Sequence, residues 1–109
     1  MEALEIKILD KKIVKISLFE DINTLFIVEI FFRDVRNMKS FSITLSDVLY
    51  FDYVDSNLGY VEKVKYFIRE DKTHYLSLDP DDTIRDKPLE SDNCLIIARD
   101  IKIKENFNV

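Results

Sequence analysis

The segment INTLFIVEIFF, residues 22–32, decides the fold class of this chain. Its residues are apolar on both faces of an extended chain and rich in β-branched and aromatic types, a composition typical of strands buried on both sides. Its longest apolar run, Leu25 to Phe32, is interrupted by Glu29 and is far shorter than the roughly 18 residues of a membrane-spanning helix. The segment therefore predicts a strand at the centre of a sheet.

Alternation of apolar and polar residues continues on both sides of this segment. Residues 4–8 and 14–18 alternate around a predicted turn at residues 10–12, which indicates a hairpin with one buried face. Residues 41–45 alternate in the same way. Residues 48–54 fit either one helical turn or a strand, and their four β-forming side chains favour the strand.

A second hairpin is predicted in the C-terminal half. Residues 55–59 form a turn signal, because Asn57 and Gly59 adopt positive φ at little cost. Beyond it, the alternation from Tyr60 to Ile68 and the segment from Thr73 to Leu78 predict two strands joined by a turn at residues 70–72.

The C-terminal third adds a loop and a last strand. Residues 79–92 contain both prolines and predict a long exposed loop, a type of segment that often carries function. Residues 94–104 predict the last strand. We therefore expect one all-β domain over residues 1–109, an antiparallel sandwich or partly open barrel of seven or eight strands.

Composition agrees with one folded domain. The chain has 109 residues, of which 47% are hydrophobic and 34% charged. It can therefore form one hydrophobic core with a hydrated, charged surface. Its N-terminus is acidic, unlike a secretory signal, and Cys94 is the only cysteine. We therefore expect a cytoplasmic protein in which Cys94 is buried.

Motifs for catalysis are missing from the sequence. A single glycine excludes the phosphate-binding and nucleophile-elbow motifs, which need several. The only histidine, His74, lies in a predicted strand, where a structural or surface role is expected. We therefore expect a protein that is not an enzyme and has no catalytic residues and no cofactor.

A metal site is not expected either. One cysteine and one histidine cannot supply the three or four ligands of a zinc site. Asp79, Asp81, Thr83 and Glu90 match positions 1, 3, 5 and 12 of a calcium-binding EF-hand loop, but Ile84 replaces the required glycine. An acidic, solvated loop is the better interpretation.

Negative charge is concentrated in one segment. Residues 70–92 carry eight acids and three bases, a net charge of −5 that equals the net charge of the whole chain. The acids are Glu70, Asp71, Asp79, Asp81, Asp82, Asp86, Glu90 and Asp92. This local excess predicts electrostatic steering of a basic partner.

A second cluster alternates acids with tyrosines and contains no lysine or arginine. It comprises Asp47, Tyr50, Asp52, Tyr53, Asp55, Tyr60 and Glu62. Tyrosine is a favoured interface anchor. The candidate partner-binding residues from both segments are therefore Asp47, Tyr50, Asp52, Tyr53, Asp55, Asp79, Asp81, Asp82, Asp86 and Glu90.

Other partners are not expected from the sequence. The basic residues are matched by acids overall, which argues against binding to nucleic acid. The chain has no basic amphipathic helix for a membrane surface.

Three segments are similar to those of small bacterial all-β immunity proteins from toxin and immunity loci. They are SDVLYFDY at residues 46–53, YVEKVKYFI at residues 60–68 and CLIIARDIKI at residues 94–103. The resemblance implies a cytoplasmic protein that binds and inhibits a cognate toxin, often a basic nuclease, and it implies no catalytic residues. The alternatives are a β-barrel that encloses a small molecule and, least favoured, an enzyme.

Overall fold

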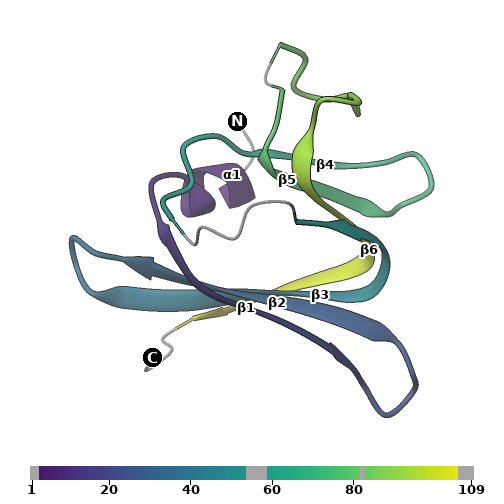
Figure 1. The fold of residues 1–109 in the computed structure, drawn as a ribbon, viewed down its shortest axis with the longest axis horizontal. Helices are drawn as coiled ribbons and strands as arrows, with labels where there is room; N and C mark the ends of the chain where they lie inside the picture. Colours follow the sequence, from purple (N-terminus) through teal and green to yellow (C-terminus); the bar gives the residue numbers. More distant parts are fainter. Residues whose placement is uncertain (1–2, 54–58, 82, 106–109) are drawn as a thin grey trace.

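The computed structural model describes residues 3–53, 59–81 and 83–105, in which six strands form one antiparallel sheet (Figure 1). The order of the strands in the sheet is β1-β2-β3-β6-β5-β4. The predicted all-β class is confirmed, with six strands in place of seven or eight. The elements are α1 (Ala3–Ile8), β1 (Lys12–Glu20), β2 (Phe26–Asp34), β3 (Lys39–Asp52), β4 (Lys65–Ile68), β5 (His74–Asp79) and β6 (Asn93–Glu105).

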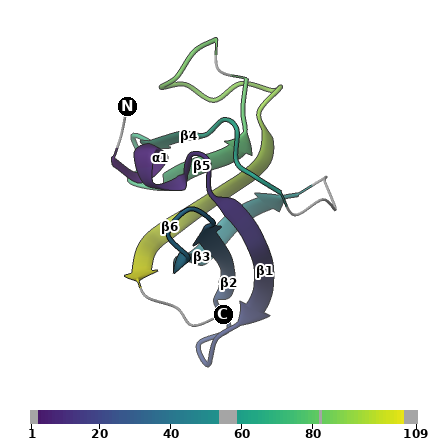
Figure 2. The same cartoon turned by 90° about the vertical axis from the view of Figure 1, so that its left-hand side faces the viewer.

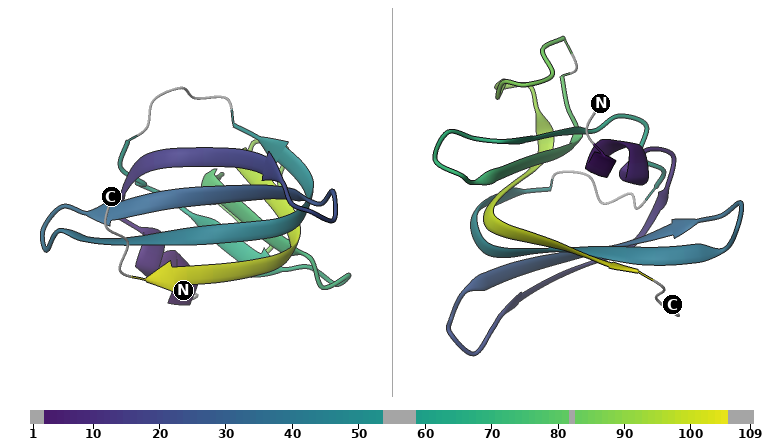
Figure 3. Two further views of the ribbon diagram at one scale, coloured as in Figure 1. Left: turned by 90° about the horizontal axis from the view of Figure 1, so that it is seen from below. Right: turned by 180° about the vertical axis from the view of Figure 1, so that it is seen from behind.

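The sheet bends back over itself because β3 and β6 are long enough to take part in two layers (Figures 1 and 3). The lower layer consists of β1, β2, the first part of β3 and the end of β6. The upper layer consists of β4, β5, the start of β6 and the end of β3 that pairs with it. A bulge between Val48 and Tyr50, next to Asp47 at a φ of 53°, interrupts the pairing of β3 with β6 near the bend. The two layers therefore belong to one open sheet with β1 and β4 at its edges, where a sandwich or a partly open barrel was expected.

The hydrophobic core fills the space between the layers. On β2, Val28, Ile30 and Phe32 are fully buried, and each pairs with an apolar residue of β3. The rings of Phe32 and Phe41 stack with 5.0 Å between their centroids. The alternation seen in the sequence thus corresponds to one face turned towards the core and one turned outward.

Residues 4–8 form the helix α1, so the prediction of a strand there was wrong. Leu4 and Ile8, four residues apart, share a helical face and are buried, whereas Ile6 is 61% exposed. The pattern fits both periods, and the tertiary contacts of α1 with β4 select the helix (Figure 2). α1 packs Leu4 and Ile8 into the hydrophobic core between the layers.

The predicted central strand is β2, but its position needs correction. It lies one strand in from the edge strand β1, and β3 and β6 occupy the middle of the sheet. One face is buried as expected, whereas Glu29 and Phe31 on the other face are only partly buried. Ile22 is 99% exposed in the turn before β2.

The remaining predictions were largely correct. Residues 48–52 continue β3 as a strand, β4 and β5 form the second hairpin, and Cys94 is buried at the start of β6. The predicted turn at residues 55–58 lies outside the described residues. Tyr60 forms only an isolated bridge with Lys12, and β4 begins at Lys65 in place of the expected Tyr60.

Candidate protein-binding surface

Residues from both predicted clusters line one surface cleft of about 280 Å³. It lies where β3 and β5 end and β6 begins, because Asp79 pairs with Asn93 and Asp52 pairs with Leu95. The described lining residues are Ile13, Tyr53, Gly59, Tyr60, Val61, Glu62, Lys63, Leu78, Asp79 and Cys94. The sheet therefore joins acids and tyrosines that are far apart in the sequence.

The tyrosines and acids of this cleft differ in exposure. Tyr53 is partly buried and stacks on Phe51 with 6.5 Å between the ring centroids, so its orientation is supported by the core. Tyr60 is 56% exposed, and both Glu62 and Asp79 are exposed. The cleft thus presents aromatic surface beside two solvated carboxylates and one exposed ammonium, that of Lys63.

The other predicted residues of β3 lie outside this cleft. Tyr50 is 48% exposed, and Asp52 is partly buried near the end of the strand. Asp47 forms an ion pair with Arg99 of β6, with 3.1 Å between its Oδ2 and the arginine Nε. Asp55 lies outside the described part of the chain.

Asp81 stabilises the loop between β5 and β6 through hydrogen bonds. Its carboxylate accepts hydrogen bonds from the hydroxyls of Ser91 at 2.6 Å and Thr83 at 2.7 Å, and from the Thr83 amide at 3.1 Å. These hydrogen bonds, that from Ser91 first, lower the pKa of Asp81 to about 2. Asp86 and Glu90 of the same loop are exposed, and Asp82 is outside the described residues.

Asp92 is the buried anchor of this loop. Its carboxylate accepts hydrogen bonds from Lys65 Nζ at 3.0 and 3.1 Å and from the Tyr75 hydroxyl at 2.5 Å. The amides of Asp81 and Leu89 donate to it at 2.9 and 3.0 Å. The Lys65 and Asp92 side chains are only 2% and 0% exposed.

The protonation of this network follows from its contacts. Burial alone raises the pKa of Asp92, but the hydrogen bonds from Tyr75 and Lys65 outweigh it and hold the pKa below its usual range. Burial, followed by the hydrogen bond to Asp92, raises the pKa of Tyr75. Asp92 is therefore a buried charge paired with Lys65, and one of the eight acids of residues 70–92 adds nothing to the surface.

Sequence reasoning assigned no such role to Lys65 and Tyr75. The alternation in residues 60–68 did place Lys65 opposite the apolar face, but its partner Asp92 lies 27 residues away. No local pattern connects the two residues, because the contact forms only when the loop folds over the outer face of β4 and β5.

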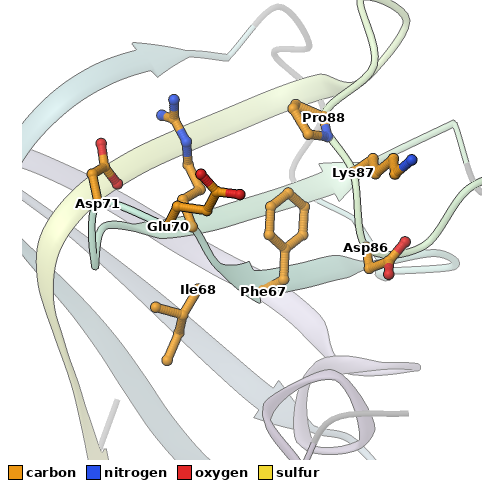
Figure 4. A pocket seen from close by; sticks show the side chains of 8 residues that line it. Phe67, Ile68, Glu70, Asp71, Asp86, Lys87 and Pro88 are labelled. Atoms are coloured by element: carbon orange, nitrogen blue, oxygen red, sulfur yellow. The ribbon is translucent and has the colours of Figure 1, made fainter.

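A second cleft, of about 500 Å³, lies between the β4–β5 turn and the loop (Figure 4). Phe67 forms its apolar side and stacks on Tyr75 at 4.6 Å. The lining residues are Phe67, Ile68, Arg69, Glu70, Asp71, Asp86, Lys87 and Pro88. Its charged lining residues are the acids Glu70, Asp71 and Asp86 and the bases Arg69 and Lys87, so both clefts have a mixed, slightly acidic rim. This second cleft has no tyrosine among its lining residues, unlike the first.

His74 contacts an aromatic side chain of the neighbouring strand. Its Nδ1 and the Tyr66 hydroxyl form a hydrogen bond of 2.7 Å, and the two rings stack at 5.9 Å. This contact is compatible with the structural or surface role that was expected for the histidine. Among residues 3–53, 59–81 and 83–105, no three or more His, Cys, Asp or Glu side chains form a group that could hold a metal ion.

The described helix is too short to cross a membrane. Comparisons of the chain with protein-family models, with curated proteins and with solved structures found no match.

Proposed function

We propose that this chain is an acidic protein-binding module, and most specifically a cytoplasmic immunity protein that inhibits a cognate bacterial toxin by stoichiometric binding. The supporting observation is the cleft at the end of β3 and β5. There Tyr53 and Tyr60 lie beside the carboxylates of Glu62 and Asp79.

The chemistry of the cleft suits a basic partner. Exposed carboxylates speed the encounter with a positively charged surface, and this effect weakens as salt screens it over a Debye length of about 8 Å at physiological ionic strength. A tyrosine buried on binding then slows dissociation, because it loses little rotamer entropy and buries much area. Acids for steering and aromatic anchors are thus combined in one site.

Coexpression with the product of the adjacent gene tests this proposal. We expect a one-to-one complex and protection of growth against that product. Glu62→Lys combined with Asp79→Lys should slow association at least about tenfold, whereas Tyr60→Ala should mainly speed dissociation, at a cost of about 2 kcal/mol.

A matched control changes the same amount of charge far from the cleft. Glu20→Lys combined with Asp100→Lys alters two exposed acids of the lower layer and should leave both rates nearly unchanged. The proposal fails if no complex forms, or if the control and the cleft variant weaken the complex equally.

One observation favours the alternative of small-molecule binding. The cleft beside Phe67, at about 500 Å³, falls in the range of roughly 300–1,000 Å³ typical of ligand sites. It opens at the surface and not inside a barrel, and its mixed charges suit a small zwitterion. Chemical-shift changes confined to Phe67, Arg69 and Pro88 in the presence of zwitterionic fragments would support this function.

A further inference from the structure

The outer face of the lower layer carries cross-strand rows of polar and basic residues. In one row Lys15, Phe31, Ser42 and Lys104 are neighbours on β1, β2, β3 and β6. The left panel of Figure 3 looks onto this layer, and no described helix or strand lies in front of its four strands.

Positive charge dominates three adjacent rows of this face. They contain five bases and one acid among the described residues, and the four lysines are exposed. The acid, Glu29, accepts hydrogen bonds from the hydroxyls of Ser42 and Thr44, each at 3.2 Å. The bases are Lys12, Lys15 and Arg33 on β1 and β2, and Lys102 and Lys104 on β6.

An aromatic ring lies between these two groups of bases. Phe31 is partly exposed, and Lys15 Nζ lies 5.5 Å from the centre of its ring. Three strand spacings separate β1 from β6, so the lysines of β1 lie about 14 Å from those of β6 across the sheet. The face therefore offers one partly exposed aromatic ring, with Lys15 over it, between groups of cations.

We propose that this face binds single-stranded nucleic acid, with phosphates on the lysines and a base stacked on Phe31. Cations that follow the backbone, together with exposed aromatic rings, are how proteins bind single strands without reading their sequence. An acidic protein segment could pair with the lysines, but its carboxylates would not stack on the Phe31 ring. A nucleic acid single strand can do both, and we therefore favour it as the ligand.

A nucleic-acid site was not expected from the composition of the chain. The net charge of −5 argues against nucleic acid, but it counts buried, paired and exposed groups alike. The fold places the cleft with Glu62 and Asp79 at one end of the sheet and these five bases on the outer face of the lower layer. The two sites adjoin at Lys12, whose backbone forms a bridge with Tyr60 of the protein-binding cleft. The residues varied in the two tests are different, so each proposal can fail without the other.

Fluorescence anisotropy of a labelled oligothymidylate, titrated with the full chain over a range of salt concentrations, tests the proposal. We expect binding at low salt that weakens with a log–log slope of about −0.7 for each phosphate contacted. Lys15→Glu combined with Lys104→Glu should weaken it at least about tenfold and reduce the slope. Phe31→Leu, which keeps the site apolar, should cost about tenfold through lost stacking.

The control is Lys72→Glu combined with Lys87→Glu, an equal charge change on exposed lysines of the upper part of the molecule. It should change the affinity by less than about twofold if the outer face is the site. Three results would overturn the proposal: no binding at low salt, equal loss in control and test variants, or binding of polyglutamate as tight as that of the oligonucleotide. Circular dichroism of each variant shows that the fold is retained.

Discussion

The outer faces of the two layers differ in what covers them. In the lower layer Lys15, Lys102 and Lys104 of the outer face are exposed, although the short side chain of Ser42 between them is buried. In the upper layer the loop between β5 and β6 folds over the outer face, so Lys65 and Tyr75 are 1% and 2% exposed. Alternation along a strand thus predicts which side chains share a face, but not whether that face meets water.

The difference has an energetic consequence. An exposed lysine keeps its hydration and contributes little to stability. A buried ammonium must replace its hydration with hydrogen bonds, which Lys65 makes to Asp92 and to the Lys87 carbonyl. The same residue type on the outer face of the same sheet therefore has a surface role in one layer and a structural role in the other.

The largest expected effect on folding comes from a substitution on the core-facing side of the sheet, which lies between the two layers. Val28→Asp places a carboxylate at a position with 0% exposure and should prevent folding, at a cost of several kcal/mol. Lys102→Asp, on the outer face of the same layer, should remain folded. Circular dichroism and urea titration of the two variants test this, and a cooperatively folded Val28→Asp protein would contradict the assignment of the core.

A matched pair of substitutions compares the two outer faces directly. Lys65→Met leaves the Asp92 carboxylate buried without its cation and should destabilise the fold by about 3–5 kcal/mol. Lys102→Met should change the free energy of unfolding by less than about 0.5 kcal/mol. If chemical denaturation shows equal effects for the two, the loop does not isolate the upper face from water.

Acid should reduce the stabilising contribution of the buried Asp92 network in the upper layer more than that of the exposed residues of the lower layer. The folded pKa of Asp92 lies below its unfolded value, so its contribution to stability is complete above the unfolded pKa, about 3.9. That contribution is lost as the pH falls through the lower folded pKa. Asp92→Asn combined with Lys65→Met should therefore flatten the pH dependence of the free energy of unfolding below about pH 4.

Urea midpoints measured at successive pH values give this dependence. Lys102→Met serves as the reference and should keep the acid slope of the parent chain. An unchanged slope in the double variant would show that other carboxylates, such as Asp81 and Asp34 with their lowered pKa values, account for the acid sensitivity.

Much of the fold follows from local patterns that are visible in the sequence. Period-two alternation identified the strands at residues 14–18 and 41–45, and a buried apolar segment identified β2, because each pattern reports the face that a strand turns to the core. The same rule failed for residues 4–8, where Leu4 and Ile8 fit a helical face equally well. Which period applies there depends on β4, a neighbour far away in the sequence.

The candidate sites, like the fold, were predictable from the sequence only in part. Sequence alone determined that the chain is all-β, that its excess negative charge lies in residues 70–92 and that tyrosines alternate with acids in residues 47–62. Only the tertiary structure placed Glu62 and Asp79 at one cleft, buried Asp92 against Lys65, and gathered bases from three strands on one face. The physical reason is that composition and periodicity are properties of neighbours along the chain, whereas burial and charge pairing depend on which distant strands the sheet brings together.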